Sequence, residues 1–366
     1  MQSRMLLPAL TRVALARPSG GGDRLLDIGA STVRYYRRQC HCNGAPGMAA
    51  GMIDVHFHFI PQFYRDAVYE AGSGPAIARY PDWTPALALE LMDKYWIAVA
   101  MLSLAQPGVG FLPAAKAAGF ARRCNDYAAD LIARHPKRFG CFGLLPMHDI
   151  GAAIAEARYC LDTLRFEGIS LFASYGEKFL GDASFDPLLD YLDAAKAVVH
   201  VHPALHPSSK SLDLPWPGFM IEYVFDTTRA AVNLLFSGAL ERFPHIRFIL
   251  SHAGGTLPFI AWRLSVAPMI DKRLKARSRE GIFAGFKTFW YDNALASGVQ
   301  PMGALSRIAA KERIVFGSDW PFCNDRVVAE EVADFTAPGF LAPNAVNLIA
   351  RENALALFPH RVDHLA

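Results

Sequence analysis

The 366-residue chain lacks several features that define other classes of protein. No apolar run reaches the about 18 residues that a membrane-spanning helix needs, so we expect no membrane segment. Six scattered cysteines are too few for a disulfide scaffold and suit reduced thiols in a cytoplasmic protein. The formal net charge is only +3 and no basic stripe is present, which argues against nucleic acid as a partner.

What the sequence does contain is apolar residues: 52% of the chain is hydrophobic and 19% is charged, as in a well-packed globular protein. Residues 1–51 differ from the rest, because they are rich in arginine, poor in acids and interrupted by three glycines at 20–22. We expect them to be an N-terminal extension that is disordered or results from a misassigned start, with translation beginning at Met48 or Met52. A transit-type peptide is the alternative.

From Met52 onward, short runs rich in Val, Ile and Phe alternate with longer helical patterns, which is typical of repeated βα units and a parallel sheet. The eight predicted strands are residues 52–58, 97–103, 139–144, 168–173, 198–202, 246–251, 287–291 and 313–317. Apolar residues at three- and four-residue spacing predict helices at 121–134, 152–163 and 227–242. Residues 52–366 are therefore predicted to form one α/β domain, a (β/α)₈ barrel of the TIM type.

A doubly wound open sheet is the structural alternative for such a pattern. The first predicted strand lacks the glycine-rich turn that a dinucleotide site in that fold requires, and we expect no organic cofactor. The two longest interruptions, residues 60–90 and 203–220, follow the first and fifth strands. In a barrel both would lie at the C-terminal mouth, where sites are built.

Histidine and aspartate residues follow four of the predicted strands. His56 and His58 end the first strand and, one residue apart, share a face; His202 ends the fifth; His252 and Asp319 follow the sixth and eighth. A pair of imidazoles on one face can be hydrogen-bonded core residues or half of a metal site. Scattered core residues have no reason to fall at strand ends, so the joint pattern favours a site at the barrel mouth.

The motifs HxH, VHP, SHAGG and GSDWP, in this order, resemble those of the amidohydrolase superfamily. More narrowly, they look like its branch of metal-dependent, non-oxidative decarboxylases, which includes aminocarboxymuconate semialdehyde, resorcylate and 6-methylsalicylate decarboxylases. The resemblance covers nearly all of residues 52–360. It implies an amidohydrolase-like barrel in which one divalent metal ion, zinc or manganese, is bound by four side chains: His56, His58, His202 and Asp319.

The resemblance also implies that His252 and Asp319 are the catalytic residues. Relatives with two metal ions carry a lysine at the end of the fourth strand, where this chain reads GISLFAS, so a single ion is expected. Trp216 matches a tryptophan of the substrate pocket, and Arg263 matches an arginine that reaches the substrate carboxylate from a neighbouring subunit. A homodimer or higher homo-oligomer is therefore expected. The arginine that some members carry after the second strand is missing from LSLAQPG, which argues against a dicarboxylate substrate.

The expected reaction is the non-oxidative decarboxylation of a small aromatic acid of the ortho-hydroxybenzoate type, for example a 6-methylsalicylate-like compound, with release of CO₂. The substrate carboxylate and phenolate would bind the metal, and Asp319 or a protonated His252 would protonate the ring carbon. The same residues could instead serve a metal-dependent hydrolase of a lactone, ester or cyclic amide. The loop at 203–220 and Arg263 favour decarboxylation.

Overall fold

The computed structural model describes residues 51–75, 79–212, 215–337 and 341–359 of the chain. Eight strands form one parallel sheet in the order β1-β2-β3-β4-β7-β8-β9-β10. Their bounds are β1 Met52–His58, β2 Ile97–Ser103, β3 Phe139–Leu144, β4 Gly168–Phe172, β7 Val198–His202, β8 Arg247–Leu250, β9 Trp290–Asp292 and β10 Ile314–Val315. A short antiparallel pair, β5 Ser174–Tyr175 with β6 Lys178–Phe179, follows β4.

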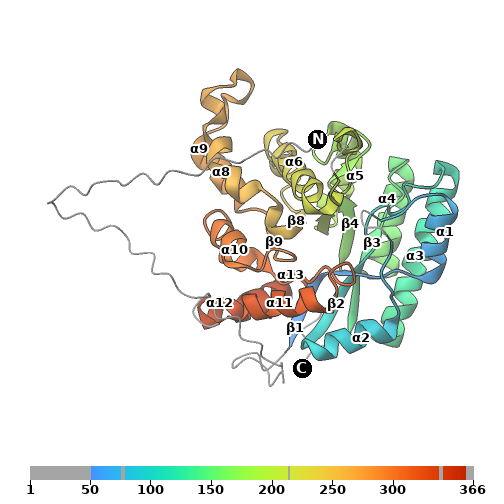
Figure 1. Ribbon diagram of the computed structural model, residues 1–366. Helices are drawn as coiled ribbons and strands as arrows, with labels where there is room; N and C mark the ends of the chain where they lie inside the picture. Colours follow the sequence, from blue (N-terminus) through green and yellow to red (C-terminus); the bar gives the residue numbers. More distant parts are fainter. Residues whose placement is uncertain (1–50, 76–78, 213–214, 338–340, 360–366) are drawn as a thin grey trace, which may run out of the picture. The chain divides into compact units, whose positions relative to one another are not determined.

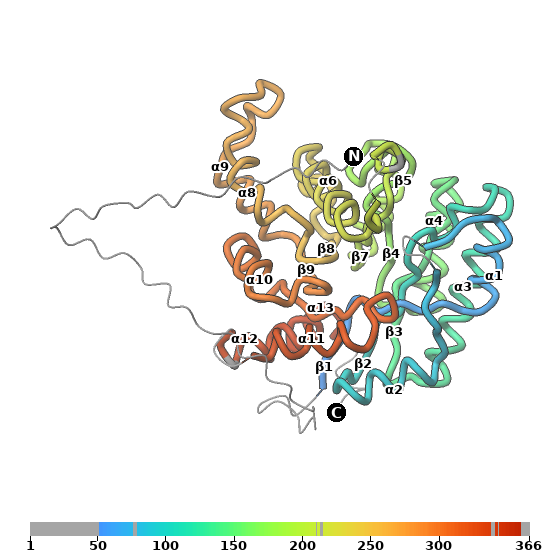
Figure 2. The backbone as a smooth tube through the Cα atoms, in the orientation of Figure 1, coloured from blue at the N-terminus to red at the C-terminus, as the bar shows by residue number. Residues whose placement is uncertain are grey.

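Helices surround this sheet on its outer side (Figures 1 and 2). They are α1 Gln62–Glu70, α2 Pro85–Lys94, α3 Ala114–Arg134, α4 Ile150–Arg158, α5 Asp186–Ala194, α6 Glu222–Phe236, α7 Ala239–Arg242, α8 Leu257–Val266, α9 Arg279–Phe286, α10 Val299–Leu305, α11 Asp325–Phe335, α12 Pro343–Asn347 and α13 Asn353–Leu357. None of the described helices is long and apolar enough to cross a membrane.

Local sequence explains where several helices begin and which face they bury. The side chains of Thr84, Asp149 and Asn324 accept hydrogen bonds from backbone N–H groups in the first turns of α2, α4 and α11. In α3 the buried positions recur every three or four residues, from Ala117 to Leu131, so one stripe of the helix packs on the sheet.

The sheet closes into a barrel between β1 and the segment that follows β10. The Val55 N–H donates to the carbonyl of Phe316 at 2.9 Å, and the His58 N–H donates to that of Trp320 at 2.7 Å. The Asp319 N–H in turn donates to the carbonyl of His56 at 2.8 Å. The seam of the barrel is therefore made by the same residues that the sequence places in the site.

The barrel interior is filled by apolar side chains that several strands point inward, with α13 packed against them. Ile53 and Val55 of β1 belong to this inner core. The pairing of β1 with β2 becomes irregular between Asp54 and Phe57, and through this irregularity His56 and His58 also point into the barrel. A larger apolar layer lies between the sheet and the helices.

The predicted barrel is confirmed, and the eight predicted strands correspond to the eight observed. The seventh was misplaced: residues 287–291 were predicted, but the strand is Trp290–Asp292, because Lys287 and Thr288 complete the turn that ends α9. The helix predicted at 227–242 is interrupted, since Gly238 adopts a left-handed conformation between α6 and α7. Of the predicted extension 1–51, all but Gly51 lies outside the described residues.

Gly317 tests how tightly the site is packed against the barrel. A Cβ added there would lie 2.7 Å from the Cβ of His56 and 3.3 Å from that of Asp292. We expect Gly317→Ala to lower the free energy of unfolding by about 1–3 kcal/mol, because neither strand can move away easily. Chemical denaturation measures this.

Gly303 is the matched control, because an added Cβ within α10 meets no atom within 4 Å. Gly303→Ala should leave stability unchanged or raise it by ~0.4–1 kcal/mol. Equal stability changes for the two variants would contradict the packing argument.

Candidate metal centre and active site

Three histidines at the barrel mouth have one ring nitrogen fixed by a hydrogen bond. His56 Nδ1 lies 2.9 Å from Asp292 Oδ2, and His58 Nδ1 lies 3.2 Å from the carbonyl oxygen of Ser103 and 3.0 Å from its hydroxyl oxygen, which can accept as well. His202 Nδ1 lies 2.8 Å from the carbonyl oxygen of Pro203. Carbonyl and carboxylate oxygens only accept, so each Nδ1 carries a proton, and in the neutral ring each Nε2 then presents a lone pair.

These lone pairs converge with the carboxylate of Asp319. The Nε2 atoms of His56 and His58 are 3.1 Å apart, and Asp319 Oδ1 lies 3.3 Å and 3.0 Å from them. With both nitrogens unprotonated, this buried oxygen receives no hydrogen bond. His202 completes a group whose ligating atoms all lie within 4.8 Å of one another.

The lone pairs of these nitrogen and oxygen atoms repel one another unless a cation lies among them. Three imidazoles and one carboxylate form a donor set that divalent transition metals accept. The residues therefore fit a divalent metal site, with the Nδ1 hydrogen bonds acting as the outer shell that orients each ring.

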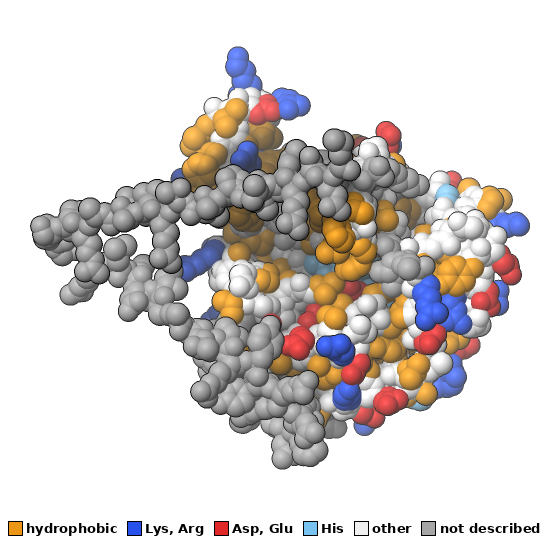
Figure 3. Space-filling model, in the orientation of Figure 1, with side chains coloured by type: hydrophobic (Ala, Val, Ile, Leu, Met, Phe, Trp, Pro, Cys, Tyr) orange, Lys and Arg blue, Asp and Glu red, His pale blue; other side chains and the backbone are white. Residues whose placement is uncertain are grey.

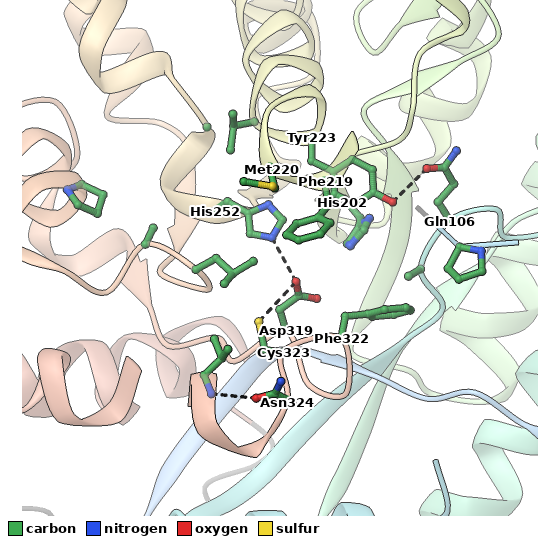
Figure 4. A pocket seen from close by; sticks show the side chains of 18 residues that line it. Gln106, His202, Phe219, Met220, Tyr223, His252, Asp319, Phe322, Cys323 and Asn324 are labelled. Carbon is green, nitrogen blue, oxygen red and sulfur yellow. Dashed lines mark hydrogen bonds and ion pairs between the residues drawn. The ribbon is translucent and has the colours of Figure 1, made fainter. Parts of the chain in front are cut away.

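His252 lies beside this group without belonging to it. Its Nε2 is 3.6 Å from Asp319 Oδ2, and neither of its ring nitrogens has a hydrogen-bond partner although the side chain is buried (Figure 4). His252 and Asp319 both have positive φ values, 56° and 55°, which is uncommon for residues with a side chain. Backbone strain of this kind is found where the surrounding structure holds a functional side chain in place.

Asp292 is the site residue that the sequence prediction missed. Its Oδ2 accepts from His56, while its Oδ1 accepts from the backbone N–H of His252 at 2.9 Å and of Ala294 at 3.1 Å. It also lies 3.5 Å from Nε2 of His200, which stacks on Phe142 one layer deeper in the barrel. If the seventh strand had been predicted to end one residue later, Asp292 would have been recognised as an acidic residue at its carboxyl end.

The electrostatics of the site favour a positive charge near His56. Burial opposes protonation of this ring, but the carboxylates of Asp292 and Asp319 raise its pKa well above the ordinary value. A divalent cation at Nε2 would satisfy the same carboxylates. Burial lowers the pKa of His58 and His202, which keeps both rings neutral and available as ligands.

The acids are held ionised. Burial of Asp319 opposes ionisation, but the attraction of the facing histidines, His56 foremost, outweighs it, so its pKa is well below the usual range. The pKa of Asp292 is lowered in the same way, with His56 as the strongest favourable partner against burial. Burial lowers the pKa of His200 to about 4, as expected for a ring kept neutral in the interior.

A cavity of about 540 Å³ opens above the metal site. Its wall is largely apolar, and Figure 4 shows Phe219, Met220 and Phe322 around His202, His252 and Asp319. Cys323 Sγ lies 4.0 Å from Asp319 Oδ2. None of the described residues that line the cavity is a lysine, an arginine or a glutamate. Cavities of roughly 300–1,000 Å³ are typical of small-molecule sites.

The structure thus brings together the five residues that were predicted to bind the metal or to act in catalysis: His56, His58, His202, His252 and Asp319. The roles of these residues remain predictions. The two residues predicted to bind substrate lie elsewhere. Trp216 is 64% exposed and does not line the cavity, and Arg263 is exposed on α8. Their roles also remain predictions, and within one chain neither side chain contributes to the cavity wall.

Comparison with known proteins identifies the family. The amidohydrolase family profile matches residues 53–360. A 6-methylsalicylic acid decarboxylase of Penicillium expansum is 38% identical over 274 residues, which cover 74% of this chain and 84% of the relative. A second 6-methylsalicylic acid decarboxylase, from Aspergillus aculeatus, is 36% identical and covers 84% of this chain and 96% of its own.

A solved structure shares the fold. The dihydroxybenzoic acid decarboxylase of Polaromonas, with bound manganese and the inhibitor 2-nitroresorcinol, has a TM-score of 0.74 at 25% identity, covering 86% of this chain and 99% of that one. The chain belongs to the amidohydrolase family. Within it the chain is a carbon–carbon lyase of the decarboxylase branch, as its motifs predicted.

The role of Asp292 in orienting His56 can be tested by measuring how tightly the protein binds a metal ion. Asp292→Asn removes the negative charge that orients and polarises His56, so we expect the metal to bind about 10- to 100-fold more weakly. Competition with a chromogenic chelator measures this. Asp325→Asn is the control, because that carboxylate pairs with Lys94 at an exposed position. Unchanged affinity in Asp292→Asn would contradict the orienting role.

Proposed function

We propose that the protein decarboxylates an aromatic carboxylic acid of the ortho-hydroxybenzoate type, such as a 6-methylsalicylate-like acid, and releases CO₂. The observation that carries this proposal is a cluster of three imidazoles and one carboxylate at the base of an apolar cavity. Relatives that share 36–38% of their residues with the chain are named as decarboxylases of this kind of acid. The hydrolase alternative would use the same residues, but no observation favours it.

When bound, a divalent cation supplies a Lewis acid that neutralises the substrate carboxylate and phenolate. His56, His58, His202 and Asp319 would hold it, and because these side chains are buried they would keep water away from it. The apolar side chains of Phe219 and Phe322 enclose the substrate ring and exclude water from it.

The remaining chemical task is to deliver a proton to the ring carbon that bears the carboxylate. Asp319 is held ionised, which suits a ligand better than a proton donor. His252 lines the cavity and neither of its ring nitrogens has a hydrogen-bond partner, so its Nε2 is the atom best placed to hold the proton and transfer it. Departure of CO₂ then restores the aromatic ring.

One ion per chain is proposed, with zinc as the first choice because it accepts imidazole and carboxylate ligands in this number. Manganese is the alternative, supported by its presence in the Polaromonas decarboxylase. Elemental analysis of the purified protein distinguishes the two. A cytoplasmic location is proposed as well, since the cysteines in the described part of the chain are buried free thiols.

A homodimer or higher homo-oligomer is proposed because α8 and the turns after it expose a hydrophobic surface. Phe259 is 88% exposed and Ile270 83%, and Trp262 and Met269 lie nearby in the sequence. Figure 3 shows hydrophobic side chains gathered on the protruding segment that carries α8. Arg263 lies on the same helix, so association through this surface would carry it to a neighbouring subunit.

The reaction can be followed by a label. In D₂O the metal-loaded enzyme should convert 6-methylsalicylate into the phenol with deuterium at the carbon that lost the carboxylate, and chelation should abolish turnover. His252→Ala should keep its metal yet lose about 10²- to 10⁴-fold in kcat. His245→Ala, at an exposed position, is the control. Ester or lactone cleavage without CO₂ from any hydroxybenzoate would refute decarboxylation.

Arg263 links oligomeric state to substrate binding. We expect Arg263→Ala to raise KM about 10- to 100-fold with unchanged metal content, because a charged hydrogen bond to the substrate carboxylate contributes roughly 1.5–3 kcal/mol. Arg307→Ala, also exposed, should have no effect. Light scattering gives the molecular mass in parallel. A fully active monomer would overturn the shared site.

A further inference from the structure

Two polar side chains, Gln106 and Tyr223, stand out in the largely apolar wall of the cavity. Gln106 lies in the segment after β2, and Tyr223 lies in the first turn of α6. They are 117 positions apart in the sequence, yet the Tyr223 hydroxyl lies 3.1 Å from Gln106 Oε1 (Figure 4). The pair belongs to the same cavity as Asp319 and His252 but ligates nothing there.

The direction of this hydrogen bond is determined by a third group. The backbone N–H of Leu205 donates to Gln106 Oε1 at 2.9 Å, so the carboxamide cannot be turned round without facing one donor with another. Oε1 carries no proton, and the Tyr223 hydroxyl must therefore be the donor in its contact with Gln106. Both lone pairs of Oε1 are then in use.

This leaves the cavity with a specific hydrogen-bonding capacity at this wall. The Tyr223 hydroxyl has committed its proton, but its oxygen still has a lone pair that can accept a hydrogen bond. A hydroxyl group on a ligand can donate to it. A carboxylate cannot, and the described lining residues include no lysine or arginine that would neutralise a second negative charge.

We propose that Tyr223, held by Gln106, is the specificity-determining contact of the cavity: it accepts a hydrogen bond from a further hydroxyl on the substrate ring and disfavours a second carboxylate. This inference rests on the proposed function, because it takes the ring to be anchored at the metal through its own carboxylate. The contact favours monocarboxylates that carry a ring hydroxyl in addition to the ortho group over analogues that lack it; an acid such as 6-methylsalicylate, which has only the ortho hydroxyl, binds without this contact.

The test measures binding separately from turnover. The full-length, metal-loaded His252→Ala protein, in which turnover is slow, is titrated calorimetrically with salicylate, with the four 2,x-dihydroxybenzoate isomers and with 2-hydroxyisophthalate. At least one dihydroxy isomer should bind about 3- to 10-fold more tightly than salicylate, the gain from one neutral hydrogen bond. The dicarboxylate should bind at least about tenfold more weakly, because Arg263 is taken up by the first carboxylate and no lysine or arginine of the described cavity wall neutralises the second.

Adding Tyr223→Phe should remove the advantage of that isomer and leave salicylate affinity within about twofold. Gln106→Met, which frees the hydroxyl from its anchor, should reduce the same advantage. Tyr64→Phe is the matched control: this buried hydroxyl donates to the carbonyl of Gly108 at 3.0 Å, on the same segment as Gln106, but does not line the cavity. It should leave the preference intact. Thermal unfolding and metal content verify that each variant is folded.

Three outcomes would overturn the inference. The first is that no dihydroxybenzoate isomer binds more tightly than salicylate to the protein that retains Tyr223. The others are that Tyr64→Phe abolishes this preference as fully as Tyr223→Phe, or that the dicarboxylate binds as tightly as salicylate. The proposed function is judged independently by CO₂ release from the wild-type enzyme. Turnover without the binding pattern rejects only the role of Tyr223. The binding pattern without turnover of any hydroxybenzoate rejects only decarboxylation.

Discussion

The carboxylate of Asp292 is the point on which the geometry of the active site depends. One oxygen accepts the Nδ1–H of His56, which leaves the Nε2 lone pair directed at the metal position, and the other accepts the backbone N–H of His252. A single buried charge thus sets the tautomer of a ligand and the position of the expected proton donor. Burying a carboxylate is costly, and the several donors around Asp292 offset that cost.

The site and the barrel seam are also the same piece of structure. Asp319 contributes its carboxylate to the metal group and its backbone N–H to the carbonyl of His56, and His58 closes the seam through its own N–H. The left-handed backbone at His252 and Asp319 is maintained because hydrogen bonds on both sides hold these residues. Pre-organisation of this kind costs stability locally and positions side chains without further motion.

The cavity above the proposed metal site suits a substrate with a single charged group. Its wall offers apolar contacts from Phe219, Met220 and Phe322, a single hydroxyl–carboxamide pair, and charge only at its base. In such low-dielectric surroundings the attraction between a carboxylate and a metal-centred positive charge is strong. In the proposed binding mode, the carboxylate at the base orients the substrate and the neutral groups that meet the wall determine which substrates are preferred.

Much of this could be read from the sequence, because the relevant signals are local. Alternating β and α patterns predicted eight strands, and parallel strands present their carboxyl ends at one edge, so residues such as His202 and Asp319 could be assigned to a common site although 117 positions separate them. The ends of short strands were less certain, and for that reason Asp292 was missed at the end of a strand placed too early.

Other features depended on contacts that no local pattern encodes. The pairing of Gln106 with Tyr223, and the orientation that Leu205 imposes on it, arise where irregular segments from different βα units meet. The position of Trp216 outside the cavity wall follows from the path of such a segment. Sequence alone predicted the barrel and the set of side chains proposed to bind the metal, because periodicity and strand ends are local properties. Only the tertiary structure showed which tautomers these histidines adopt, which residues hydrogen-bond to the side chains of the site, and which residues line the cavity. These features result from packing between distant parts of the chain.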